Sequence, residues 1–238
     1  MTGHGAKAAL SAEDALSAED ARAIARAFAP VRPWGNRWDY YYTLSKLRSD
    51  PLYPGVLDAL RGTRAPVLDM GCGLGLLAHA LRRDGQHLPY RGVDNDAAKV
   101  DRGRDVAARS GLNATCFERM DLATTLPEHR GSVAILDVLQ YLPAAAQAHL
   151  LQRAAAMLDD DSRLVMRMAL ADHTRRGRIS RLGDRAAHLI GWMQFRPRHY
   201  PDADSLQAQL QQAGLSVRIT PLYGRTPFNN WLVVAQRS

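Results

Sequence analysis

The chain has 238 residues, of which 46% are hydrophobic and 7% aromatic, enough apolar side chains for the core of one α/β domain. No run of about 18 apolar residues is present to span a bilayer, and the N-terminus lacks the basic-then-apolar pattern of a secretory signal, so we expect a soluble, cytoplasmic protein. The two cysteines, Cys72 and Cys116, are too few and too far apart for a disulfide framework or a metal site, and we expect both to be thiols.

The net charge of +7 would suit an anionic partner, but its distribution does not indicate a nucleic-acid-binding protein. Lysine occurs only at positions 7, 46 and 99, so arginine supplies almost all of the positive charge. The arginines are spread along the chain, with one local cluster between residues 175 and 185. Because net charge affects association and solubility rather than specificity, nucleic acid is a disfavoured partner.

Residues 1–30 are predicted to be an N-terminal extension that is helical or disordered. They contain "ALSAEDALSAED" (residues 9–20), an exact duplication of six residues. Each copy places an Asp three residues after a Ser, a pattern typical of a helix N-cap followed by a first-turn charge. We expect a solvated tail without catalytic residues.

Residues 31–60 are predicted to be an aromatic helical region, within "PVRPWGNRWDYYYTLSKLRSDPLYP". Asn36 can cap a helix that runs to about Arg48. On that helix Trp38, Tyr41, Tyr42 and Ser45 share one face, and Tyr40, Leu44 and Leu47 share another. Aromatic residues at helical spacing favour packing, but three consecutive tyrosines cannot all point into one core.

From residue 61 to the end, short apolar runs alternate with helical stretches. The runs expected to form strands are 66–70, 89–94, 114–118, 132–137 and 163–168, and the helical stretches between them are 76–83, 97–110 and 144–158. This alternation predicts a doubly wound, Rossmann-like parallel sheet with right-handed crossovers. Near the end, a helix that stops at Gly214 is followed by strands 215–220 and 231–236 without a helix between them, so the seven-stranded sheet should finish in an antiparallel hairpin.

The sequence "VLDMGCGLGLL" (residues 67–77) joins the first strand to its helix, where an open α/β sheet binds its ligand. A dinucleotide fingerprint would need a third glycine where Leu76 stands, and a P-loop would need a Gly-Lys-Ser or Gly-Lys-Thr ending. Asp69 would repel a pyrophosphate but suits a ligand that carries an amine and a sulfonium. The pattern therefore favours S-adenosylmethionine over NAD.

Two further acids follow the next two strands. Asp94 in "YRGVDND" ends the second strand, where a carboxylate can accept both hydroxyls of a ribose. Asp121 in "RMDL" follows the third strand and can accept from an adenine amine while Met120 and Leu122 cover the ring. A strand-end Asp can also cap a helix or form a turn, but three acids after three successive strands favour a binding site.

With these motifs the chain resembles the class I S-adenosylmethionine-dependent methyltransferases, from about Val56 to the C-terminus. "VLDMGCGLG" is similar to that family's first motif, "GVDND" to its ribose-binding acid and "MDL" to its adenine-side acid. "ILDVLQYLP" resembles its fourth-strand segment, in which Gln140 and Tyr141 replace a usual pair of histidines. The aromatic region followed by "SKLRSDPLYPGVLDALRG" is also similar to methyltransferases of bacterial aryl-polyene pigment pathways, a resemblance that implies an aromatic or polyene acyl acceptor held on a carrier protein.

The resemblance implies S-adenosyl-L-methionine as cofactor and an N-terminal helix over its methyl end, where we assign Tyr42 and Lys46, the latter to the cofactor carboxylate. No metal site is expected, because Asp137 has no evident acidic pair for a metal-assisted reaction. The candidate cofactor-binding residues share a place at the ends of the first four strands or on the lid helix: Asp69, Gly71, Cys72, Gly73, Asp94, Asn95, Asp121, Leu122, Asp137, Tyr42 and Lys46.

Residues 169–200 form a basic and aromatic insert that suits a lid or a substrate wall. Transfer to a hydroxyl or phenol acceptor calls for a base, for which His199 and Tyr200 are the first catalytic candidates and His173 the next, although a solvated surface role is the alternative. We expect O-methylation of a small molecule or of a carrier-bound acyl or aromatic group, in secondary metabolism or pigment synthesis. A nucleic-acid methyltransferase and a non-catalytic, cofactor-binding partner subunit are the alternatives.

Overall fold

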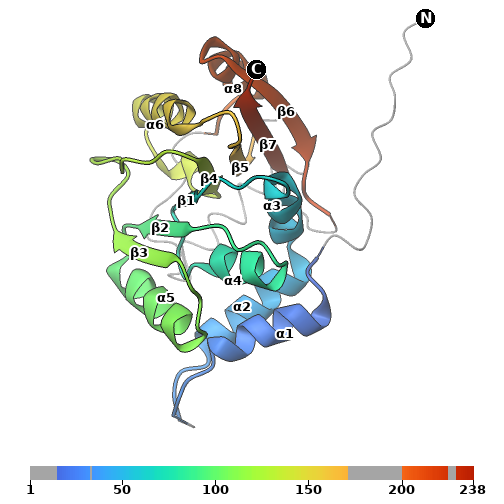
Figure 1. Ribbon diagram of the computed structural model, residues 1–238, viewed down its shortest axis with the longest axis vertical. Helices are drawn as coiled ribbons and strands as arrows, with labels where there is room; N and C mark the ends of the chain where they lie inside the picture. The colour runs from blue at the N-terminus through green and yellow to red at the C-terminus, as the bar shows by residue number, and fades with distance from the viewer. Residues whose placement is uncertain (1–14, 33, 171–199, 225–228) are drawn as a thin grey trace, which may run out of the picture.

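The computed structural model describes residues 15–32, 34–170, 200–224 and 229–238. In these ranges seven strands form one mixed sheet in the order β3-β2-β1-β4-β5-β7-β6, with helices on both faces (Figure 1). The strands are β1 (Val67–Met70), β2 (Tyr90–Asp94), β3 (Thr115–Arg119), β4 (Ser132–Leu136), β5 (Leu164–Ala169), β6 (Leu215–Pro221) and β7 (Asn230–Arg237). The helices are α1 (Ala18–Ala27), α2 (Trp38–Ser49), α3 (Leu52–Leu60), α4 (Leu76–Arg83), α5 (Ala97–Arg109), η1 (Leu139–Tyr141), α6 (Ala144–Met157) and α8 (Ala203–Gln212). The predicted Rossmann-like sheet with its terminal hairpin is confirmed.

The five parallel strands bring the predicted site residues to one edge of the sheet. β1 pairs with β2 on one side and with β4 on the other, so that Asp69 lies opposite Gly92 and Ala134. The strand order reverses between β1 and β4, which is the switch point where open α/β sheets bind their ligands. The carboxyl ends of β1, β2 and β4 therefore lie at the same edge of the sheet.

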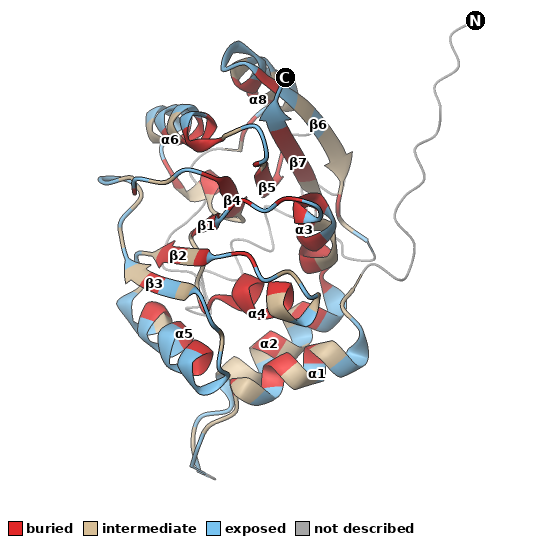
Figure 2. Cartoon of the chain, in the orientation of Figure 1, coloured by how far each residue is buried: buried red, intermediate tan, exposed pale blue. Residues whose placement is uncertain are grey.

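Alternation along β1 divides the core into two clusters, one on each face of the sheet (Figure 2). Val67 joins the cluster formed with α1, α3, α4 and α5, whereas Leu68 and Met70 join the cluster formed with α6 and α8. Asp69 has the same side-chain direction as Val67 and so lies on the α3 and α4 face.

Helix α1 corrects the expectation of a solvated N-terminal tail. Ala21, Ile24 and Phe28 are buried in the same cluster as α4, and α1 contacts both α2 and α4. The cap predicted for the second hexapeptide copy is present, because the Ser17 hydroxyl oxygen accepts from the N–H of Asp20 at 3.0 Å. The first copy lies outside the described residues. The apolar face of α1 is short, so it is not evident in a sequence segment that is rich in acidic residues.

Helices α2 and α3 form the region expected to be an aromatic lid. The side-chain oxygen of Asn36 accepts from the N–H of Trp38 at 2.9 Å, but the N-cap residue of α2 is Arg37, which has no side-chain cap, so the predicted cap at Asn36 lies one residue too early. Helix α3 has no clear sequence signal, because Pro54 and Gly55 lie inside it. Pro54 falls in the first turn, where its missing N–H is not needed, and a Cβ at Gly55 would come within 2.8 Å of a Leu222 methyl carbon. Glycine therefore serves close packing there.

The predicted insert falls almost entirely outside the described residues, which end at Leu170 and resume at Tyr200. Leu170 is buried directly after β5. Among the described helices, none is both long enough and apolar enough to cross a membrane.

Candidate functional site

The turn between β1 and α4 holds its three glycines in different settings. Gly71, Gly73 and Gly75 all have positive φ, of 83°, 54° and 73°, a conformation that costs glycine little. A Cβ at Gly71 would lie 2.1 Å from a methyl carbon of Val138, and one at Gly75 would lie 2.2 Å from the Phe117 ring. A Cβ at Gly73 would meet nothing within 4 Å. Packing thus requires two of the glycines, whereas Gly73 borders open space.

Asp94 lies directly against this turn. Its Oδ2 accepts a hydrogen bond from the N–H of Gly73 at 2.8 Å, and its Oδ1 accepts one from the N–H of Asp96 at 2.9 Å. Asn95, between the two acids, is exposed. The end of β2 and the glycine turn therefore form one unit, in which the Asp94 carboxylate is fixed by two backbone donors.

Cys72 ties the turn to β2 through its backbone. The N–H groups of Gly71 and Cys72 donate to the carbonyl of Val93 at 2.7 and 3.0 Å. The Cys72 side chain is a free thiol, as expected. Burial raises the pKa of this thiol well above its ordinary value, and the neighbouring Asp69 and Asp94 raise it further. A protonated thiol is a poor nucleophile, so Cys72 is a structural part of the turn.

Asp69 is a buried acid at the base of the site, with 3% of its surface exposed. Its Oδ2 accepts a hydrogen bond from the Tyr90 hydroxyl at 2.7 Å. Burial raises the pKa of Asp69 to about 7; the Tyr90 hydrogen bond lowers it and the charge of Asp94 raises it. In the ranges that the structure covers, no ion pair involves Asp69. The site thus contains a buried carboxylate that a cationic ligand group would stabilise in its charged form.

Asp121 lies in an exposed turn just beyond β3. Its Oδ1 accepts from the N–H of Ala123 at 3.0 Å, and its carbonyl accepts from the hydroxyl of Thr124 at 3.1 Å. Leu122 and Met120 are half-buried and pack on the cluster of α6 and α8. Asp121 therefore forms a turn, which was the alternative to a binding role, and it lies at the same edge of the sheet as Asp94.

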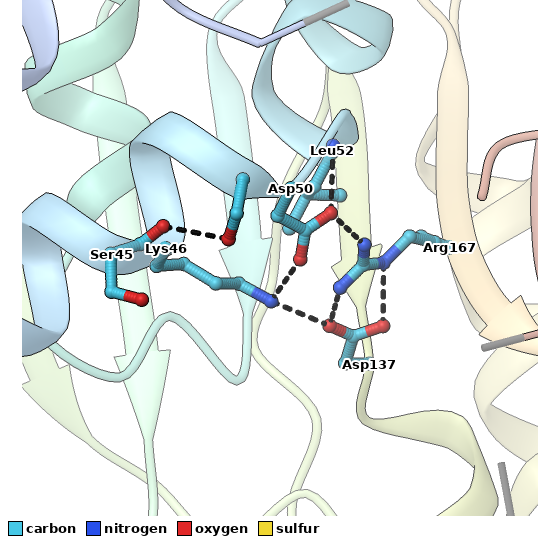
Figure 3. A network of polar contacts seen from close by, with 7 residues as sticks. Ser45, Lys46, Asp50, Leu52, Asp137 and Arg167 are labelled. Carbon is cyan, nitrogen blue, oxygen red and sulfur yellow. Dashed lines mark hydrogen bonds and ion pairs between the residues drawn. The ribbon is translucent and has the colours of Figure 1, made fainter. Parts of the chain in front are cut away.

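Four charged side chains form a closed network beside the end of β4 (Figure 3). Arg167, on β5, donates through Nε to Asp137 at 2.7 Å and through its two Nη atoms to Asp50 and Asp137. Lys46 completes the network with contacts of 2.5 Å to Asp50 and 3.5 Å to Asp137. We call Lys46, Asp50, Asp137 and Arg167 the charge ring. Two cations balance two anions, so the ring is neutral as a whole.

The ring is buried enough to perturb its members. Arg167 is 2% exposed, and burial alone would lower the pKa of its guanidinium, but Asp137 and Asp50 together raise it. Burial alone would raise the pKa of Asp50, but Arg167 and Lys46 lower it below its ordinary value. The ring therefore joins α2, the start of α3, β4 and β5 through groups that stay charged.

The ring changes the interpretation of two predicted residues. Lys46 was expected to meet a cofactor carboxylate, but the structure pairs it with Asp50 and Asp137, because both carboxylates reach its ammonium from the ends of α2 and β4. Asp137, for which the sequence offers no acidic pair to hold a metal, shares Arg167 with Asp50 as an ion-pair partner. Asp137 also has a φ of 60°, a conformation that is uncommon outside glycine.

Tyr42, the other lid residue, is half-buried and faces the charge ring. Burial raises the pKa of its phenol, with a lowering effect from Lys46 and a raising effect from Asp137. Tyr53, on α3, is buried between Tyr42 and Asp69, and its pKa is also raised by burial.

Gln140 follows β4 in η1, where the resemblance expects a histidine. Its side-chain nitrogen donates to the carbonyl of Asp137 at 3.1 Å. Its Oε1 is buried and, among the residues that the structure describes, has no hydrogen-bond donor. Since a buried acceptor without a donor costs free energy, this oxygen is suited to a donor from a ligand or a water molecule.

The two predicted catalytic residues cannot both be placed. His199, the next candidate His173, and the arginine cluster lie outside the described residues. Tyr200 is described, and it lies half-buried just before α8. Over the described ranges, no group of three or more His, Cys, Asp and Glu side chains is placed to hold a metal ion.

Four residues of the site were missed by sequence reasoning: Asp50, Tyr53, Tyr90 and Arg167. Arg167 had a usable signal, because an arginine in the apolar run "RLVMRMAL" is rarely buried without an acidic partner. The other three had none, since their roles depend on which strand ends and helices meet.

Comparison with known proteins identifies a family and a shared fold. A family model described as "Methyltransferase domain" matches residues 46–218. Among solved structures, an O-methyltransferase family protein from Burkholderia thailandensis is 21% identical, with a TM-score of 0.64 and coverage of 84% of this chain and 59% of that one. Magnesium protoporphyrin IX methyltransferase from Synechocystis PCC 6803, solved with bound SAH, is 20% identical, with a TM-score of 0.62 and coverage of 90% and 92%. The mitomycin 7-O-methyltransferase MmcR is 19% identical, with a TM-score of 0.57 and coverage of 83% and 57%.

These likenesses show the fold, because each is below 25% identity. The chain spans 59% of the length of the Burkholderia protein and 57% of MmcR. No curated protein matches the sequence. The family match covers most of the chain, including the glycine turn, the acids at the ends of β1 to β4 and the charge ring. The chain therefore belongs to the methyltransferase-domain family.

Proposed function

We propose that the protein is an S-adenosylmethionine-dependent methyltransferase that acts on a small molecule or on a carrier-bound acyl or aromatic acceptor, with transfer to oxygen. The observation that carries the proposal is the unit formed by the glycine turn and two acids. Gly73 borders open space, Asp94 binds its N–H, and the buried Asp69 is without an ion pair in the part of the chain described. Two of the structural neighbours are named as O-methyltransferases, which favours oxygen as the acceptor atom.

In this proposal different site residues bind different parts of the cofactor. Asp69 attracts the amino group, Asp94 accepts from the ribose hydroxyls, and Asp121 and Leu122 lie on the adenine side. Gly71, Cys72, Gly73 and Asn95 line the turn. S-adenosylmethionine, when bound, supplies a methyl group on a positively charged sulfur. The side chains that remain near the end of β4, Tyr42 and Asp137, border the methyl end.

The protein's own contribution to transfer is alignment and the exclusion of water. The charge ring holds α2 against the ends of β4 and β5 and so fixes the wall that Tyr42 belongs to. Lys46 acts within that ring rather than on the cofactor carboxylate. His199 and Tyr200 remain the proposed pair for taking a proton from a hydroxyl or phenol acceptor. A carboxylate acceptor would need no base.

Calorimetric titration with S-adenosylhomocysteine tests the cofactor assignment, with NADH as the control ligand. We expect micromolar affinity, about −8 kcal/mol, for S-adenosylhomocysteine only. Gly73→Ala should abolish this binding, because the new methyl group projects into the open space beside the glycine turn. Gly111→Ala is the matched control: Gly111 also has a positive φ, of 64°, and a Cβ there meets nothing within 4 Å.

Both glycine variants should lose about 1 to 2 kcal/mol of stability from the left-handed backbone, but only Gly73→Ala should lose the ligand. Full affinity in Gly73→Ala would show that the turn is not the site. Binding of NADH instead would contradict the choice of cofactor, and binding of neither ligand by the wild type would contradict the function.

A further inference from the structure

The loop between α1 and α2, with the first turns of α2, carries an exposed apolar surface. Among the described residues, the strongly exposed large hydrophobic side chains are Val31 (81%), Trp34 (96%), Trp38 (54%) and Tyr41 (57%). We call these four residues the aromatic tip. All lie between residues 31 and 41, and Figure 1 shows their loop projecting from the end of the molecule. Exposed apolar residues that gather in one place mark an interaction surface.

The tip has a defined conformation. The N–H of Gly35 donates to the carbonyl of Arg32 at 3.0 Å, which closes a turn around Trp34. A Cβ at Gly35 would lie 2.3 Å from Cβ of Pro30, so the close approach of the two sides of the loop requires glycine. The turn therefore holds Trp34 outward before any partner is present. Less conformational entropy is then lost when a partner binds.

The charged side chains between Ala29 and Trp38 are all positive. Arg32 and Arg37 are exposed on either side of Trp34, and the sequence from Ala29 to Trp38 contains no acid. The next acid, Asp39, is held in an ion pair with Arg102 at 2.8 Å. An anionic partner therefore meets two free-standing cations and no opposing carboxylate in this segment.

We propose that the aromatic tip docks the protein on the surface of a bilayer that contains anionic phospholipids. Tryptophan and tyrosine favour the membrane interface, because their rings are apolar and their polar atoms stay near water. Arginines beside them add electrostatic attraction to anionic head groups. A projecting loop can also insert into a deformable bilayer surface, whereas a protein partner would need a pocket of matching shape. Trp34 and Val31 enter the head-group region, and Arg32 and Arg37 pair with lipid phosphates.

Sedimentation of the full chain with vesicles tests this docking. Vesicles of equal parts phosphatidylglycerol and phosphatidylcholine should carry the wild type down at low salt, whereas pure phosphatidylcholine vesicles should bind it far less. Arg32→Ala and Arg37→Ala should each weaken binding about fivefold, and Trp34→Ala should weaken it at least as much. Added salt should release the protein.

Arg130→Ala is the charge-matched control, because Arg130 is an exposed arginine in the loop before β4. It should bind vesicles as the wild type does. All four side chains lie outside the cofactor site, so S-adenosylhomocysteine titration of each variant reports intact folding separately from docking. Three results would overturn the proposal: no binding of the wild type to anionic vesicles, equal binding by Trp34→Ala, or self-association or binding to an acidic carrier protein that depends on Trp34 while vesicles are ignored.

Discussion

At the scale of one residue, Asp69 shows how a buried carboxylate that suits a cationic ligand group reduces the stability of the ligand-free protein. Its folded-state pKa of about 7 lies above the ordinary value of 3.8, so the folded state holds this proton more tightly than the unfolded chain does. Stability from this group is therefore full in acid and falls as the pH rises from about 4 to about 7. A shift of about three pKa units corresponds to about 4 kcal/mol at pH 8.

Asp69→Asn should remove this loss while keeping an oxygen acceptor for the Tyr90 hydroxyl. We expect the variant to be more stable than the wild type at pH 8, by up to about 4 kcal/mol, with little difference at pH 4, and to lose affinity for S-adenosylhomocysteine. Urea denaturation at both pH values and calorimetric titration measure the two effects. Equal stability of the variant and the wild type at pH 8 would mean that ionisation of the buried Asp69 does not destabilise the folded protein.

Sequence patterns predicted which acids lie at the site, but they did not predict the contacts that the site residues make. Asp69, Asp94 and Asp121 were found because strand ends in a parallel sheet share an edge, a rule that needs no tertiary detail. The contacts of Lys46 with Asp50 and Asp137 were not predicted, because only the fold brings the end of β4 to the end of α2. Whether each acid binds the cofactor remains a prediction.

The charge ring acts at the scale of elements, since it joins α2 and α3 to β4 and β5. Arg167→Met should destabilise the fold by about 3 to 5 kcal/mol, because it leaves the buried Asp50 without its main cation. Arg91→Met is the matched control: Arg91 forms a two-point ion pair with Glu118 at 2.9 and 2.7 Å at a partly exposed position.

We expect the Arg91 variant to lose about 1 kcal/mol or less. Denaturant midpoints of both variants measure the contrast. Similar losses in the two would indicate that the ring is no stronger than a surface pair. Asp50→Asn in the Arg167→Met background should then recover part of the loss, because it removes the uncompensated charge.

Elements with strong local signals were predicted within a few residues, and those that depend on packing were not. All seven strands and the helices α4, α5 and α6 follow from alternation of apolar runs, which burial imposes directly on the sequence. Helix α3 depends on the contact between Gly55 and Leu222, two positions far apart in the chain. The packing of α1 on α4 is equally non-local, so composition alone predicted a tail.

At the scale of the whole molecule, the pH dependence of stability combines Asp69 with a second buried group. His79, on α4, is buried with an Nε2 that has no partner among the described residues, and burial lowers its pKa to about 4. The folded state therefore excludes a proton that the unfolded chain binds below about pH 6.5. Stability from His79 is full above that pH and is lost as the pH falls toward 4.

The two groups oppose each other over nearly the same range, so the wild type should show a shallow dependence of stability between pH 4 and 7. Asp69→Asn should expose the effect of His79, with a fall of about 3 kcal/mol from pH 7 to pH 4. Adding His79→Leu should flatten that fall. Denaturation midpoints across the range test this, and a flat profile in Asp69→Asn alone would contradict it.

The position of β7 has a consequence for how the sheet is completed during translation. β7 pairs with both β5 and β6, and it is the last of the seven strands to be synthesised. While the ribosome still holds residues 230–237, β6 has no neighbour and the outer edge of β5 is unpaired. Such edges invite pairing with other chains. The outer edge of β5 is therefore covered only after β7 has been made, and β3 and β6 remain the edge strands of the completed sheet.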